Sequence, residues 1–93
     1  MKERVPLYDV SIKVVDVCKN RCNNGHKVGD EWIMRYDAPE HLCAGAFHAI
    51  FPMAWMLQLG ASFPLEEDPD VAHVSCPDHN VQVIYEIRRL PQK

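Results

Sequence analysis

One segment of this 93-residue chain constrains its fold more than any other, because between positions 43 and 57 the only strongly polar side chain is that of His48. The segment is too short, and too interrupted by Pro52, to span a bilayer. We therefore expect a buried helix over 43–57 and no membrane insertion. A helix that is apolar on all sides must be covered on all sides, which one small sheet cannot do alone. The segment thus predicts a homo-oligomer that buries this helix.

Strand-like alternation of apolar and polar residues lies on both sides of the helical segment. It predicts two strands before the helix, at 10–17 and 32–36, and two after it, at 72–76 and 81–87. A short turn joins the last two strands as an antiparallel hairpin. A chain of this length suits one core. We expect a single domain over residues 1–93, of the α+β class, with a small antiparallel sheet (ββαββ) packed on the helix.

The connecting segments carry turn signals. Asn24-Gly25 predicts an ordered loop between the first two strands, and Gly60 predicts a left-handed end to the helix. Segment 66–70 is rich in acidic residues, and we expect it to be a solvated loop.

Charge argues against one class of partner. The formal net charge is -3, and the ten basic residues form no stripe along the sequence. Proteins that bind nucleic acid through its backbone carry a basic patch. We therefore expect no nucleic-acid partner.

The cysteine content indicates what kind of site the chain contains. The chain has four cysteines, and its first eight residues contain no apolar run of the kind found in signal peptides. This predicts a reducing compartment, the cytoplasm, in which cysteine clusters more often bind metal or react than form disulfides. Three of the cysteines lie at the edges of predicted elements: Cys22 in a loop, Cys43 at a helix start and Cys76 at a strand end. The predicted topology allows their side chains to converge. Cys18 and His26 are the spare candidates.

Several segments, which together span nearly the whole chain, resemble a family of small uncharacterised proteins from anaerobic bacteria and archaea. They are CNNGHKVGDE at 22–31, LC at 42–43 followed by AFHAI and Pro52, SFP at 62–64, EDP at 67–69, CPD at 76–78 and EIRR at 86–89. The family has no assigned activity. The resemblance implies a cytoplasmic, prokaryotic and anaerobic setting, and a shared set of Cys22, Cys43 and Cys76 with His26 as a fourth ligand. It also implies that Cys18 is an extra cysteine of this sequence.

Two kinds of metal centre fit these residues. Cys22, His26, Cys43 and Cys76 would close a tetrahedral zinc site, which would be structural because no coordination position remains for water. Alternatively, the three thiolates would hold an iron–sulfur cluster with one iron open or bound by another ligand. A cluster that transfers electrons would also need a redox partner protein.

Two alternatives do not involve metal. In the first, the chain is a thiol-dependent or general acid-base enzyme, in which the helix dipole stabilises the Cys43 thiolate and His26 is the base. Either Asp78 or Asp30 would orient His26, although both occupy turn positions that favour a structural role. In the second, the chain is a scaffold or protein-interaction subunit whose buried thiols are inert.

Overall fold

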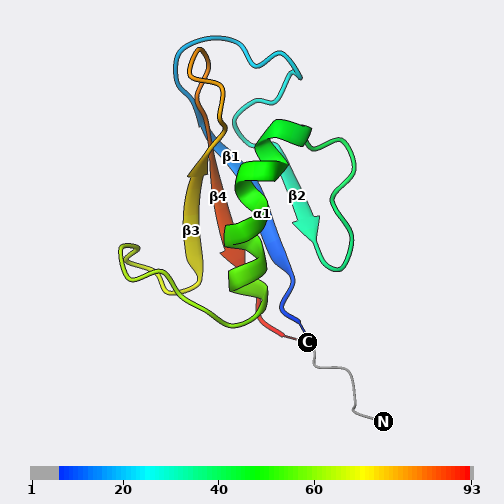
Figure 1. Cartoon of the computed structure of the whole chain (residues 1–93), viewed down its shortest axis with the longest axis vertical. Helices are drawn as coiled ribbons and strands as arrows, with labels where there is room; N and C mark the ends of the chain where they lie inside the picture. Colours follow the sequence, from blue (N-terminus) through cyan, green and yellow to red (C-terminus); the bar gives the residue numbers. More distant parts are fainter. Residues whose placement is uncertain (1–6, 93) are drawn as a thin grey trace.

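The computed structural model describes residues 7–92 and confirms the ββαββ order of an α+β fold (Figure 1). Its elements are β1 (Val10–Val17), β2 (Glu31–Met34), α1 (Ala44–Gln58), β3 (Val71–Ser75) and β4 (Val83–Arg89).

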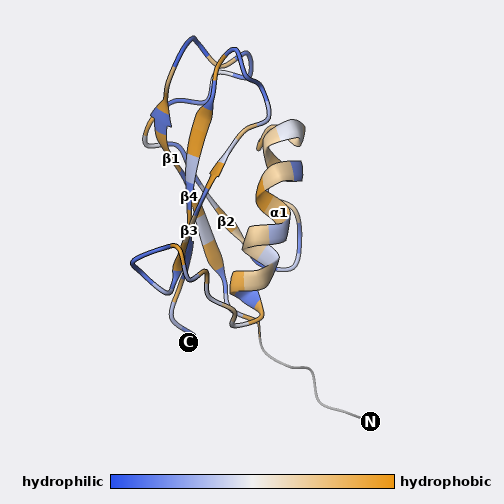
Figure 2. Cartoon of the chain, turned by 60° about the vertical axis from the view of Figure 1, so that its left-hand side comes forward, coloured by the Kyte–Doolittle hydropathy of each residue, from blue (hydrophilic) through white to orange (hydrophobic). Residues whose placement is uncertain are grey.

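The four strands form one antiparallel sheet in the order β2-β1-β4-β3. The predicted hairpin is present, since β3 pairs with β4 from Val71 opposite Arg88 to Ser75 opposite Ile84. Strand β1 pairs with β2 on one side and with β4 on the other, so the first strand lies in the middle of the sheet. Helix α1 lies across one face of this sheet as a second layer (Figures 1 and 2).

The core lies between the helix and the sheet and follows the alternation in the sequence. Alternate residues of the two central strands are buried, up to Val14 in β1 and up to Ile87 in β4, as strands with one covered face require. The buried apolar residues of these strands are Val10, Ile12, Val14, Val83, Tyr85 and Ile87, and the buried residues of the helix are Ala46, Ile50, Ala54, Leu57 and Gln58.

The second strand is shorter than predicted. We expected it to continue to Tyr36, but β2 ends at Met34 and Tyr36 is 63% exposed. Met34 pairs with Val10, the first residue of β1, so β1 offers no partner for the residues that follow. The buried Gln58 amide instead donates hydrogen bonds to the Met34 and Arg35 carbonyls, at 3.4 and 2.6 Å.

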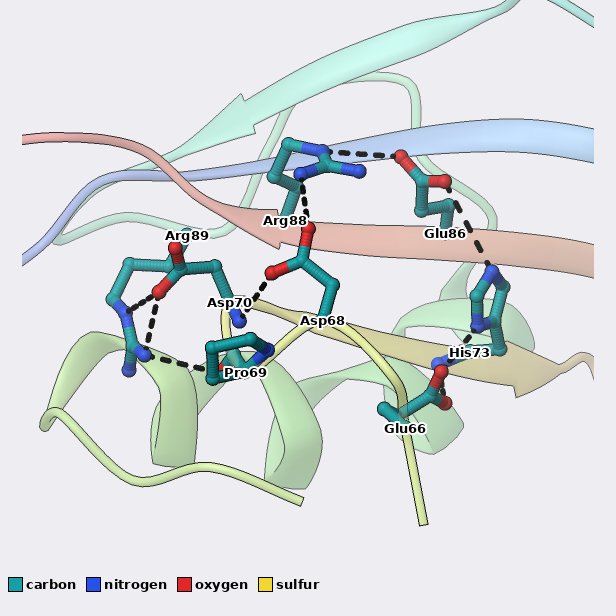
Figure 3. A network of polar contacts seen from close by, with 8 residues as sticks. All are labelled: Glu66, Asp68, Pro69, Asp70, His73, Glu86, Arg88 and Arg89. Carbon is teal, nitrogen blue, oxygen red and sulfur yellow. Dashed lines mark hydrogen bonds and ion pairs between the residues drawn. The ribbon is translucent and has the colours of Figure 1, made fainter. Parts of the chain in front are cut away.

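The acidic segment is not simply solvated. Asp68 pairs with Arg88 at 3.0 Å, and Glu66 accepts hydrogen bonds from the backbone and ring nitrogens of His73, at 3.1 and 2.9 Å (Figure 3). Residues 66–70 are exposed or half-buried, as expected for a surface loop, but local composition does not reveal the cations that pair with this segment only after folding.

The sheet covers only one side of α1. Phe51, Met53, Trp55 and Met56 are each between 37% and 44% exposed, and Figure 2 shows apolar residues along the length of this helix. Within residues 7–92, no helix has the length and apolar character needed to cross a membrane.

Candidate functional site

Three segments meet at one end of the sheet, beside the N-terminus of α1. They are the β1–β2 connection, the start of the helix and the β3–β4 connection (Figure 1). The first and third are joined by backbone hydrogen bonds from Cys18 N to Gln82 O, at 3.2 Å, and from Lys19 N to Val81 O, at 3.0 Å. Cys22, Cys43 and Cys76 line one cavity of about 270 Å³ at this end. The expected convergence of these three cysteines is therefore present.

Local structure fixes each cysteine differently. Cys22 opens a tight turn in which its carbonyl accepts the Gly25 N–H at 2.9 Å, and Gly25 has a φ of 76°, which favours glycine. Cys43 is the N-cap residue of α1. Cys76 follows β3 and continues its pairing with β4, because its N–H donates to the Val83 carbonyl at 2.9 Å and its Sγ accepts the Val83 N–H at 3.3 Å.

The helix start favours the thiolate form of Cys43. Its thiol makes no full capping hydrogen bond, yet the backbone N–H of Ala46 lowers the pKa of Cys43, with smaller contributions from the Gly45 N–H and the Asn24 side chain. Partial desolvation opposes them without reversing the shift. Unpaired N–H groups and the helix dipole stabilise negative charge at a helix N-terminus.

His26 is adjacent to this thiol but is already engaged. The side chain is buried, its ring lies edge-on to that of Trp32 with centroids 4.8 Å apart, and its Nε2 accepts a hydrogen bond from the Cys43 N–H at 3.1 Å. Nε2 therefore carries no proton, which leaves Nδ1 as the protonated nitrogen of the neutral ring. In this arrangement Nε2 is occupied in holding the start of α1.

The remaining predicted residues lie at the edge of the site or outside it. Cys18 is exposed and does not line the cavity; its thiol lies 3.5 Å from an Asp16 carboxylate oxygen. Asp30 and Asp78 accept backbone N–H groups in their own turns, from Lys27 at 3.0 Å and Asn80 at 2.9 Å, and Asp78 also lines the cavity.

The expected metal ligands do not form a ready-made metal site. Within the described part of the chain, no group of three or more His, Cys, Asp or Glu residues is arranged so that it could hold a metal ion. The three thiols share a cavity without forming such a site.

Sequence reasoning missed two residues that line the cavity. Asn24 was identified only as a turn residue, yet its side chain contributes to the lowered pKa of Cys43. Tyr85 was identified only as an inward residue of the last strand, which the alternation predicts correctly. The alternation predicts that this side chain points inward, but it does not predict what surrounds the hydroxyl group.

Comparisons with protein families, curated proteins and solved structures found no match for this chain. The functional interpretation therefore depends on the geometry of the site alone.

Proposed function

We propose that the chain is a small metal-binding protein in which Cys22, Cys43 and Cys76 ligate a centre of several ions, an iron–sulfur cluster. The observation that carries this proposal is that three thiols from three separate elements line one cavity. Backbone N–H groups face two of these sulfurs, those of Cys43 and Cys76. Such donors stabilise thiolates and tune the clusters that thiolates hold.

The engagement of His26 favours a cluster over one zinc ion. A structural zinc site needs four ligands, and His26 is the fourth candidate beside the three cysteines. His26 would reach a zinc ion through Nε2 only by giving up its hydrogen bond to Cys43. Zinc bound by Cys22, His26, Cys43 and Cys76 is therefore the second choice for the centre.

Iron, sulfide and zinc content test this proposal. Protein purified without oxygen is expected to contain iron and sulfide, and the individual Cys22→Ser, Cys43→Ser and Cys76→Ser variants are expected to lose them. Cys18→Ser is the matched control and should retain the wild-type content, because Cys18 lies outside the cavity. Zinc near one equivalent, without sulfide, would instead support the four-ligand zinc site.

A second candidate is thiol chemistry at Cys43 in the metal-free protein. The lowered pKa of Cys43 and its place in an open cavity favour a nucleophilic thiolate. His26 would serve as its base only after Nε2 is released from the Cys43 N–H. The metal centre ranks higher because it gives all three thiols a role.

For partners, we propose a second copy of the chain, bound through α1. Rings at spacings of four residues, Phe47, Phe51 and Trp55, form a continuous row on the helix, with centroids 5.7 Å apart in each step. The helix carries no Asp, Glu, Lys or Arg, so two copies would pack without bringing like charges together. A purely scaffolding role through this surface, with inert thiols, is the remaining alternative.

For the setting, we propose the cytoplasm and a redox partner protein. The four cysteines are unpaired, which agrees with a reducing compartment. A cluster in a protein this small would exchange electrons with another protein. The family resemblance and its anaerobic setting remain predictions.

A further inference from the structure

Strand β3 forms one edge of the sheet, so half of its backbone N–H and C=O groups point away from β4. Just after β3, the Cys76 N–H donates to the Val83 carbonyl at 2.9 Å, which makes this an inward position. Inward and outward positions alternate along an antiparallel strand. The outward backbone groups of β3 are therefore those of Val71, His73 and Ser75. An outward edge of this kind can pair with a strand of another chain.

The acidic segment 66–70 binds two of these three outward N–H groups. The Val71 N–H donates to the Asp68 carbonyl at 3.2 Å, and the His73 N–H donates to Glu66 Oε2 at 3.1 Å. The other oxygen of the Glu66 carboxylate lies 2.9 Å from Nδ1 of the His73 ring (Figure 3). The Glu66 side chain is only 24% exposed. One carboxylate thus binds both the backbone and the ring of the central residue of β3.

The same segment is anchored to β4, the strand on the inner side of β3. Asp68 pairs with Arg88 at 3.0 Å, and Asp70 pairs with Arg89 at 2.8 Å. The Asp70 carbonyl also accepts the Arg89 N–H at 2.7 Å. The sheet therefore fixes the segment that covers its own edge.

We propose that segment 66–70 is a strap that closes the β3 edge against pairing with β3 of a second copy of the chain. An antiparallel pair centred on His73 would bond each His73 N–H to the His73 carbonyl of the other copy. Glu66 Oε2 occupies that acceptor position. Strand β3 carries no Asp, Glu, Lys or Arg, so charge on the strand itself does not prevent such pairing. The strap leaves α1 as the surface for self-association.

The test uses the full-length chain carrying Phe51→Glu, which disables the proposed contact through α1, under reducing conditions. In this background Glu66→Ala is expected to tighten self-association at least about tenfold in sedimentation velocity experiments, because pairing no longer has to displace a carboxylate from each edge. Glu67→Ala is the matched control, since it removes the same charge from an exposed neighbour. Glu66→Gln retains an acceptor for the His73 N–H and should behave as the parent does.

Two further measurements place the effect at the edge of β3. Ser75→Pro, added to Glu66→Ala, should abolish the gained association, because proline removes an outward N–H without breaking the pairing with β4. The His73 N–H should exchange with solvent at least about tenfold faster in Glu66→Ala than in Glu67→Ala. Equal association or equal exchange in these two variants would overturn the proposal, as would association that persists after Ser75→Pro.

Discussion

Cys43 and His26 are linked by a single hydrogen bond that explains much of the site at the residue scale. By accepting the Cys43 N–H, the His26 ring fixes where α1 begins. That start places the N–H groups of Ala46 and Gly45 toward the Cys43 sulfur. His26 therefore supports the Cys43 thiolate through the backbone and does not need to act as its base.

Cys43 should be the cysteine that reacts at the lowest pH in metal-free protein. Thiolates react with iodoacetamide and thiols do not, so the lowered pKa of Cys43 should keep its alkylation fast at pH values where an ordinary thiol is protonated. Mass spectrometry of partially alkylated protein would identify the site. Cys18 is the internal control, because partial desolvation and the nearby Asp16 raise its pKa. Faster labelling of Cys18 near neutral pH would contradict this account.

The same shift gives a pH dependence of stability. Because the folded protein lowers the pKa of Cys43 below its ordinary value of 9.0, the folded state is the one that releases this proton more readily. The stabilisation is fully present above that ordinary value and is lost as the pH falls through the lowered pKa. Urea titrations of the metal-free wild type and of Cys43→Ser at several pH values would measure this effect. As the pH falls through the lowered pKa, the free energy of unfolding of the wild type should decrease relative to that of Cys43→Ser.

At the scale of the elements, Arg89 joins the end of β4 to both ends of the α1–β3 connection. Its guanidinium donates to Asp70 Oδ1 at 2.8 and 3.0 Å, and to the carbonyls of Leu57 and Ala61 at 3.0 and 2.8 Å (Figure 3 shows the Asp70 contacts). The side chain of Arg89 is only 10% exposed. It therefore satisfies helix-end carbonyls that the helix itself leaves open.

Arg89→Ala should lower the free energy of unfolding by about 3 kcal/mol, because it leaves a carboxylate and three carbonyls, those of Leu57, Ala61 and Pro69, without their charged donor. Arg88→Ala is the matched control. The side chains of its ion pair with Asp68 are 43% and 45% exposed, and ion pairs this exposed to solvent contribute little to stability. Urea unfolding of both variants measures the difference. Equal losses would show that Arg89 does not have this role.

The elements were predictable from sequence to the extent that their signals are local. Alternation identified the four strands, and the uncharged segment identified the helix, because burial of one face leaves its period in the sequence. The end of β2 was not predictable, since it depends on which residue of β1 lies opposite Met34. The engagement of His26 likewise depends on a contact between distant segments.

At the scale of the whole molecule, the outward side of α1 should mediate self-association. Phe51 is the middle ring of the aromatic row and is 41% exposed. Phe51→Glu would place a charge at the centre of the proposed interface and should shift the protein from dimer to monomer in sedimentation velocity experiments. Leu65→Glu is the control, because Leu65 is fully exposed outside the helix. A wild type that stays monomeric at high micromolar concentration would contradict the proposed dimer.

Cys22, Cys43 and Cys76 are proposed to act together on one metal centre, and iron and sulfide analysis of anaerobically purified protein is the decisive measurement. We expect iron and sulfide in the wild type and in Cys18→Ser, with a broad visible absorption band, and loss of both in each of the other three serine variants. Wild-type protein that is folded, free of iron and zinc, and unable to take up either on reconstitution would contradict the proposal.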